Sequence, residues 1–420
     1  MPHVGGYLPD RTATVFISAG ELSGEMHAAH LVDALQALRA ARGLRPAICE
    51  GNGSLRMRQA GVRLLFDVAT WSELGILHNA LKARFFHRVI TATARYILSN
   101  QPDVVVLVDN RVLNLSLARL LRSRGYGGRI VYYVAPVRWE SLYGEREGAR
   151  RRSLARFLQV KRYCDLALLI YPVSLDAYET LGIPHEFIGH PLCDLAKPRL
   201  TDAEFTALTG IAYDPAAPPL IVGALPGSRV REVRCIAPVV YRALALLEET
   251  FSGEPGLPEF HAVSPVPHPD LRPAMIDAAR EAGLRNLTLL DPEYGYDLMA
   301  RARLMIVKSG TGLHECALIG VPAIMCYRVP RYVAWLTRHV LRFSMPYYGL
   351  PNLLAGRPIV PELIQEECTH LRIAELAGSL LFEEGERRAM LDGFSEVRRM
   401  LCRPAPLERA AELVQELLST

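Results

Sequence analysis

Short runs of apolar and β-branched residues alternate with longer stretches of helical periodicity along the whole chain. This alternation is typical of parallel sheets whose strands are joined by crossover helices. In the first half, helices are predicted at 27–40, 89–98 and 114–124. The apolar runs predict strands at TVFIS (14–18), DVVVLVD (103–109), RIVYYVA (129–135), LALLI (166–170), PLIVGAL (219–225), EFHAVSP (259–265), LTLLD (287–291), LMIVKSG (304–310) and PAIMCYR (322–328).

The pattern is interrupted once, at residues 195–219, where KPRL and DPAAPP are rich in residues that break helices and strands. We therefore predict an α/β protein with two Rossmann-like domains facing across a cleft. The N-terminal domain is expected at 1–200 and the C-terminal domain at 201–370. Helices of 371–420 are expected to pack back on the N-terminal domain or on a partner subunit. Because such sheets bind ligands outside the carboxyl ends of their strands, the chemistry should lie in the cleft.

Composition agrees with two well-packed domains, since the chain has 420 residues of which 50% are hydrophobic. The eight cysteines are scattered without a C-x-x-C pair, which indicates neither a zinc site nor a disulfide framework and fits a reducing cytoplasm. The N-terminus lacks the pattern of a signal peptide, and no apolar run approaches the roughly 18 residues of a membrane span. We therefore expect neither secretion nor a spanning helix.

The formal net charge is only +4, with 44 Arg and 4 Lys among the 48 basic residues. Guanidinium suits phosphate and carboxylate groups better than ammonium does. One basic cluster lies at 146–162, where the alternatives are nucleic acid, anionic lipid or a solvated helix face, the last being the default. The segment 74–98 mixes Leu and Phe with basic residues, so it either lies on a bilayer surface or packs against the sheet.

Two predicted turns between a strand and a helix carry small residues beside charged ones. The first contains Gly20, Glu21, Ser23 and Gly24, where backbone amides at a helix N-terminus would bind an anion or a sugar. Close packing of the helix on the strand is the alternative. The second turn ends in Arg229, which would neutralise a pyrophosphate leaving group, unless it is an ordinary surface arginine.

A third turn combines small residues with a glutamate one helical turn later. Ser309, Gly310 and Thr311 follow a predicted strand and would cradle a phosphate, while Glu315 would bind a ribose diol. The helix dipole accounts for the negative charge of Glu315 but not for the whole arrangement. Further along, the side-chain amides of Asn352 and Gln365 are candidates for contacts with phosphate oxygens.

Taken together, these stretches resemble the lipid-A-disaccharide synthase family, whose members are glycosyltransferases of the GT-B architecture. The resemblance runs in family order from about Thr14 to the end of the chain. It rests on AGELSGE (19–25), Asp109 with Asn114, IGHPLCD (188–194), LPGSRVREV (225–233), SGTGLHECALIGVPAIMCYR (309–328) and LPNLLAGRPIVPELIQEE (350–367).

The resemblance implies transfer of a 2,3-diacylglucosamine from UDP to 2,3-diacylglucosamine 1-phosphate, with inversion at the anomeric carbon and release of UDP. It implies no metal, no cofactor and no nucleic-acid partner. It also implies a peripheral position on the cytoplasmic face of the inner membrane and a homodimer. Asp109 would be the general base, since it ends a predicted strand at the cleft. Asn114 and Trp139 would lie on the acceptor side.

The chain departs from the family pattern only in its first half. The family has a proline, a second acidic residue and an aromatic residue where this chain has Arg111, Val112 and Leu113. A glutamate commonly follows a Gly-Ile pair in the family, whereas here Gly75 and Ile76 are followed by Leu77 and His78. Three alternatives therefore remain open: a UDP-sugar transferase with another acceptor, an isomerase like UDP-N-acetylglucosamine 2-epimerase, and a paralogue that binds lipid or nucleotide without catalysis.

Overall fold

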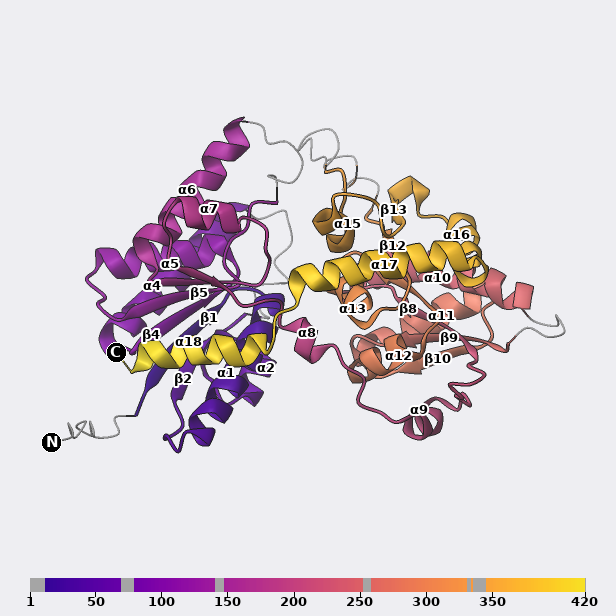
Figure 1. The fold of residues 1–420 in the computed structure, drawn as a ribbon, viewed down its shortest axis with the longest axis horizontal. Coiled ribbons are helices and arrows are strands. Elements are labelled where there is room, and N and C mark those ends of the chain that lie inside the picture. Colours follow the sequence, from indigo (N-terminus) through magenta and orange to yellow (C-terminus); the bar gives the residue numbers. More distant parts are fainter. Residues whose placement is uncertain are drawn as a thin grey trace. The chain divides into compact units, whose positions relative to one another are not determined.

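A computed structural model describes residues 12–68, 79–139, 147–251, 258–330, 334 and 345–419. Its strands form two parallel sheets, one of seven strands in the order β3-β2-β1-β4-β5-β6-β7 and one of six in the order β10-β9-β8-β11-β12-β13 (Figure 1). The prediction of an α/β protein with two Rossmann-like sheets is confirmed.

The seven-stranded sheet contains β1 (Thr14–Ala19), β2 (Ile48–Gly53), β3 (Arg63–Asp67), β4 (Val104–Val108), β5 (Arg129–Tyr133), β6 (Leu166–Leu169) and β7 (His185–Phe187). The six-stranded sheet contains β8 (Leu220–Leu225), β9 (Phe260–Pro265), β10 (Leu287–Leu290), β11 (Leu304–Lys308), β12 (Ala323–Tyr327) and β13 (Glu362–Ile364). All nine predicted strands are present. β2, β3, β7 and β13 were not predicted.

The helices that accompany the first sheet are α1 (Leu22–Ala41), α2 (Leu55–Gln59), α4 (Asn79–Asn100), α5 (Arg111–Ser123), α6 (Glu147–Tyr163), α7 (Leu175–Thr180), α8 (Leu192–Leu195) and α18 (Pro406–Leu418). Those that accompany the second are α9 (Asp202–Thr209), α10 (Val230–Phe251), η3 (Pro269–Leu271), α11 (Arg272–Ala282), η4 (Pro292–Tyr294), α12 (Gly295–Arg301), α13 (Thr311–Ile319), α15 (Leu350–Ala355), η5 (Gln365–Glu367), α16 (His370–Phe382) and α17 (Glu384–Leu401).

The chain divides into two compact units at positions that differ from the predicted domain boundaries. Unit 1 comprises Met1–Asp194 and Leu401–Thr420, and unit 2 comprises Leu195–Met400. The predicted third segment, 371–420, is therefore split. Helix α16 packs on α10 and on two strands of the second sheet, so it belongs to unit 2, whereas α18 returns to unit 1 and packs on α1.

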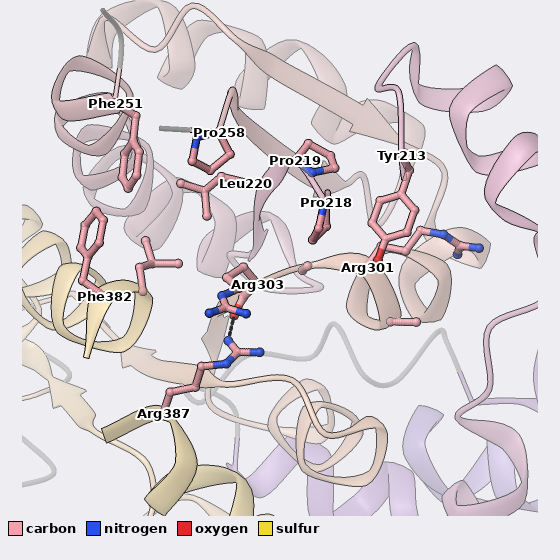
Figure 2. Close-up of a pocket in the computed structure, with 13 residues that line it drawn as sticks. Tyr213, Pro218, Pro219, Leu220, Phe251, Pro258, Arg301, Arg303, Phe382 and Arg387 are labelled. Carbon is pink, nitrogen blue, oxygen red and sulfur yellow. Dashed lines mark hydrogen bonds between the residues drawn. The ribbon is translucent and has the colours of Figure 1, made fainter. Parts of the chain in front are cut away.

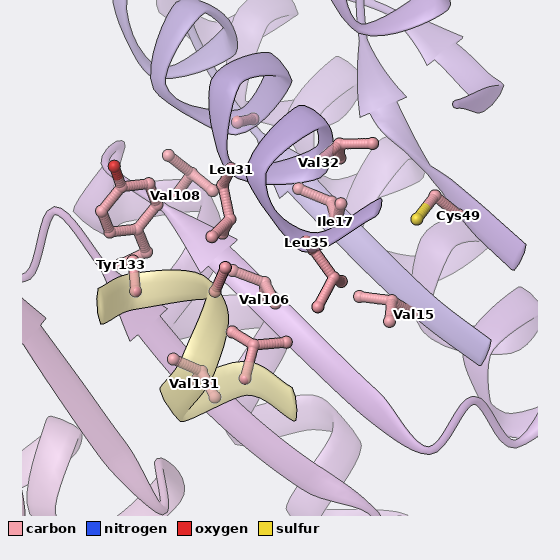
Figure 3. Close-up of a cluster of buried hydrophobic side chains, with 14 of the residues drawn as sticks. Val15, Ile17, Leu31, Val32, Leu35, Cys49, Val106, Val108, Val131 and Tyr133 are labelled. Carbon is pink, nitrogen blue, oxygen red and sulfur yellow. The ribbon is translucent and has the colours of Figure 1, made fainter. Parts of the chain in front are cut away.

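Helix α18 completes the hydrophobic core of unit 1. Ala410 and Val414 of this helix are fully buried against side chains of α1, β1 and β4. Figure 3 shows Leu31 and Leu35 of α1 beside Val106 of β4, with α18 drawn in yellow. Burial of a Leu or Val side chain contributes about 1.5–3 kcal/mol, so this helix is an integral part of unit 1.

The segment predicted as a linker is partly helical and attached to unit 2. Its helix α9 begins with a capping box between Thr201 and Glu204. Just before it, the buried Asp297 carboxylate accepts hydrogen bonds of 2.7 Å from the backbone amides of Arg199 and Leu200. The proline-rich part, 214–219, is the remnant of the predicted linker.

The two segments singled out for basic or membrane contacts are described only in part. In α4, Phe85 and Phe86 are half-buried and pack against the cluster of Val68, Val89 and Leu113. This favours packing on the sheet for that part of 74–98. His78 lies outside the described residues.

Helix α6 carries most of the basic cluster. Its apolar face buries Phe157 and Val160 on the sheet, while Lys161 and Arg162 are exposed. The solvated helix face thus accounts for the described part of the cluster. Arg146 and the side chains of Arg150 to Arg152 lie outside it.

The expectation that the cysteines form no disulfide is wrong for one pair. Cys193 in α8 is bonded to Cys402, with Cα atoms 5.7 Å apart and a sequence separation of 209. Such a separation leaves no spacing signal, and only the fold brings the pair together. The remaining cysteines are free and mostly buried.

Candidate active site

Each sheet has one point at which the strand order reverses, and ligands of doubly wound sheets bind outside the carboxyl ends of the strands there. In unit 1 this point lies between the parallel neighbours β1 and β4. In unit 2 it lies between β8 and β11. The three turns singled out in the sequence, together with Asp109, follow these four strands.

The turn after β1 lies against the end of β4. The Nδ2 atom of Asn110 donates to the carbonyl of Gly20 and to the carboxylate of Glu21, both at 3.2 Å. A Cβ at position 20 would lie 2.5 Å from Asn110 Cβ, so glycine is required there. Glu21 is the N-cap residue of α1, although its side chain does not cap the helix.

Gly24 and Ser23 lie in the first turn of α1. A Cβ at Gly24 would be 3.3 Å from Asp109 Cβ, which places the N-terminal turn of α1 directly beside Asp109. The side chain of Ser23 is outside the described part of the chain. The bare backbone at Gly24 allows the helix to pack this close to Asp109.

Asp109 follows the last residue of β4 and is half-buried. Burial raises the pKa of its carboxyl group, against the opposing effects of the Asn110 backbone amide and the Arg111 charge. Its backbone is left-handed, with φ of 52°, a conformation that non-glycine residues adopt rarely and that Asp and Asn adopt more often than most. A carboxylate with a raised pKa at the end of a sheet suits a general base.

Asn110, rather than Asn114, begins helix α5. The side chain of Asn110 accepts a hydrogen bond from the Leu113 amide as the N-cap of this helix. Asn114 is fully buried one turn later, and its Nδ2 is near the carbonyls of Ser18, Val108 and Asp109, at 2.9–3.2 Å. Asn114 therefore positions the backbone of Asp109. The site role of Asn110 was missed in the sequence.

Trp139 belongs to a cluster of aromatic rings that contact one another in unit 1. Its ring is 5.0 Å from that of Tyr171, which is 5.2 Å from the ring of His190. Burial, together with the charge of Asp109, raises the pKa of Tyr171, so this phenol stays neutral. His27 of α1 completes the cluster, and its burial with His30 nearby lowers the His27 pKa to about 4. These rings form one aromatic cluster, and the charge of Asp109 acts on Tyr171 within it.

In unit 2, three charged side chains meet where β8 and β11 end. Glu232 of α10 pairs with Lys308 at 3.0 Å and with Arg229 at 3.6 Å, and it accepts a hydrogen bond from the Ser228 amide. Burial alone would raise the pKa of Glu232, but Lys308, the Ser228 amide and Arg229 outweigh it and lower that pKa. The group carries a net positive charge, which suits a phosphate. Lys308 was missed, although it immediately precedes Ser309.

The third turn has the geometry of an anion site. Gly310 is the N-cap of α13, Thr311 is its first residue, and neither uses a side chain to cap the helix. The amides at this helix terminus are thus available to a ligand. Within the helix, Glu315 accepts a hydrogen bond of 2.9 Å from the hydroxyl of Tyr296, which orients its carboxylate.

Asn352 and Gln365 hold the backbone around this turn. Asn352 is fully buried, donates to the Val360 carbonyl and to Glu362, and accepts from the amides of Ile359 and Val360. Gln365 exchanges hydrogen bonds with the backbone of Val329. Both side-chain amides are engaged within the chain, so we assign them a positioning role rather than phosphate contact.

Among the described residues, no cluster of three or more His, Cys, Asp or Glu side chains is arranged to hold a metal ion. In the same part of the chain, no helix is long and apolar enough to cross a membrane.

Solved structures of similar fold handle sugar nucleotides or transfer sugars. UDP-GlcNAc 2-epimerase from Neisseria meningitidis, bound to UDP-GlcNAc, aligns with a TM-score of 0.54 at 12% identity, over 97% of this chain and 100% of that one. The calicheamicin glycosyltransferase CalG4 aligns with a TM-score of 0.56 at 17% identity, over 97% and 99% of the two chains. The two sheets and their turns therefore define a protein of the GT-B fold.

The sequence comparisons go further. The family model described as "Lipid-A-disaccharide synthetase" matches residues 15–415. Lipid-A-disaccharide synthase of Geobacter sulfurreducens is 30% identical over 405 residues, and that of Myxococcus xanthus is 32% identical over 409, each covering 96% of this chain and 97% of the relative. The chain belongs to the lipid-A-disaccharide synthase family, and it is a glycosyltransferase of lipid A biosynthesis.

Proposed function

We propose that this enzyme transfers 2,3-diacylglucosamine from UDP to 2,3-diacylglucosamine 1-phosphate, with inversion, to give the lipid A disaccharide and UDP. The Asp109 carboxylate is the observation that carries the proposal. It is half-buried with a raised pKa, lies at the switch point of the first sheet, and has the first turn of α1 packed beside it at Gly24. There it accepts the proton of the acceptor hydroxyl as the hydroxyl attacks the anomeric carbon.

The donor occupies the switch point of the second sheet. Arg229 and Lys308 stabilise the negative charge that the pyrophosphate gains as the glycosidic bond breaks. The hydroxyl of Ser309 and the amides at Gly310 and Thr311 bind phosphate oxygens, and Glu315 takes the ribose diol. With two cationic side chains and a helix terminus for the leaving group, the mechanism proceeds without a metal or a cofactor.

The proposal also gives the enzyme a place in the cell. Both substrates carry acyl chains, so the enzyme works peripherally at the inner face of the inner membrane, and a homodimer is compatible with the family. No nucleic-acid partner is part of this function.

The test is to incubate the purified protein with UDP-2,3-diacylglucosamine and 2,3-diacylglucosamine 1-phosphate and to identify the lipid product by mass spectrometry. We expect a disaccharide 1-phosphate and one UDP per turnover, and only when the acceptor is present. A sugar nucleotide of unchanged mass formed without acceptor would identify an epimerase. Binding of both substrates without any product would identify a non-catalytic paralogue.

Lys308 provides a test of the donor half alone. Lys308→Gln is expected to weaken UDP binding by roughly 10-fold or more, because a hydrogen bond to a charged group contributes about 1.5–3 kcal/mol. Isothermal titration calorimetry measures the Kd, with the exposed Lys197→Gln as the matched control. Equal UDP affinity of the two variants would remove Lys308 from the donor site.

A further inference from the structure

Unit 2 has a cavity at the end of its sheet opposite to the donor turns. Its volume is about 380 Å³, within the range of small-molecule sites. It adjoins Leu220, the first residue of β8, and Arg303, which immediately precedes β11. The donor turns follow the other ends of these two strands, about 17 Å away at roughly 3.3 Å per residue. The cavity is therefore separate from the site proposed for UDP.

One wall of the cavity is apolar and aromatic. Phe382 at the end of α16 stacks on Phe251, with ring centroids 5.3 Å apart, and Phe251 stacks on Phe260. Phe382 is 57% exposed although it lies in this stack. Leu381 and three prolines extend the apolar wall (Figure 2): Pro218, Pro219 and Pro258. Such a surface in contact with water favours an apolar occupant.

The cavity also contains three arginines, of which one is neutralised. Arg301 pairs with Asp202 at 2.7 Å and lies over the ring of Phe205. The other two, Arg303 and Arg387, have no ion pair with a carboxylate within the described chain. Nη1 of Arg387 donates to the carbonyl of Arg303 at 2.8 Å, which holds the two residues side by side (Figure 2). Burial and the charge of Arg303 lower the pKa of Arg387, although Glu384 opposes this.

Two neighbouring guanidinium groups that form no ion pair with a carboxylate repel each other, and an anion between them would remove the repulsion. We propose that this cavity binds a phosphate monoester with an alkyl or acyl body, the phosphate on Arg303 and Arg387 and the chain on Phe382 and the prolines. Planar guanidinium groups suit phosphate, and the apolar wall distinguishes such an ester from inorganic phosphate. This site is independent of the proposed transferase reaction.

Hexyl phosphate, titrated by calorimetry into the full-length protein saturated with UDP, tests the proposal. We expect one binding event with hexyl phosphate. The Kd of inorganic phosphate alone should be at least 10-fold higher. The double variant Arg303→Gln/Arg387→Gln should bind hexyl phosphate at least 10-fold more weakly. Phe382→Ala should lower the affinity for hexyl phosphate but not the affinity for inorganic phosphate. The neighbouring exposed Arg388→Gln is the matched control and should bind as the wild type does.

UDP affinity of the double variant shows whether unit 2 is still folded, and it should be unchanged. Absence of hexyl phosphate binding at millimolar concentration would overturn the proposal. So would equal binding by the double variant, because the ligand would then lie elsewhere. Loss of binding in Arg229→Gln instead would assign the ligand to the donor turn and not to this cavity.

Discussion

Asp109→Asn is expected to lower kcat by about 10²–10⁴-fold, the range that a positioned general base contributes. The amide is isosteric with the carboxylate but cannot accept the acceptor's proton. UDP affinity should stay unchanged, because Asp109 belongs to unit 1 and the residues proposed for UDP belong to unit 2. Steady-state kinetics with both lipid substrates and calorimetry with UDP measure the two effects. Asp33→Asn, an exposed carboxylate on α1, is the matched control.

The raised pKa of Asp109 fixes the direction of two pH effects. As a base it is active only when deprotonated, so kcat/KM should rise with pH through a pKa above the ordinary carboxyl value and then level off. A carboxyl group whose pKa is raised by folding stabilises the fold while protonated, and this contribution is lost as pH rises through the folded pKa. The Tm of Asp109→Asn at pH 7 should therefore equal or exceed that of the wild type. A fall in Tm together with the loss of activity would indicate a structural role instead.

Reduction of the Cys193–Cys402 bond is expected to destabilise unit 1. Cys193 lies one residue before the end of the first segment of this unit, and Cys402 lies one residue after the start of its second segment. A disulfide that closes a long loop contributes about 2–4 kcal/mol, mainly by restricting the unfolded chain. For a unit of this size we expect the Tm to fall by on the order of 10 °C in excess dithiothreitol. Differential scanning calorimetry with and without reductant measures the change.

The cysteine variants separate this bond from other effects of the reductant. Cys193→Ser/Cys402→Ser should show the lower Tm under both conditions and no response to dithiothreitol. Cys235→Ser, at a free and partly exposed cysteine, should behave as the wild type. An identical Tm of the wild type with and without reductant would contradict the prediction.

The strands that were predicted and those that were missed differ in their side chains. Runs such as VVVLV of β4 are buried on both faces, and their apolar, β-branched composition alone predicts a strand. β2 has the sequence ICEGNG, with polar and glycine residues at inner positions, and it forms a strand because it pairs with β1 and β3. Its Gly51 packs so close to β1 that a Cβ would lie 2.0 Å from the Ile17 carbonyl. Such a strand is specified by its neighbours rather than by local preference.

The candidate site residues were predicted where small residues follow an apolar strand, since that signal is local. Lys308 and Asn110 were missed because their roles depend on partners in other elements: Glu232 on α10 and Gly20 after β1. The positioning role of Asn352 likewise depends on its bonds to the backbone of Ile359 and Val360, which are visible only in the fold. Helix α18 packs on α1 from the other end of the sequence, and the disulfide joins positions 209 apart, so no local pattern encodes either contact.

The return of α18 to unit 1 imposes an order on synthesis. Unit 2 is contiguous, so all of its residues are synthesised before residues 401–420 are added. Unit 1 instead begins first and is completed last, because the buried residues Ala410 and Val414 close its core. Until translation ends, the apolar face of α1 that receives them stays uncovered. The growing chain therefore needs protection of that face throughout the time taken to make unit 2.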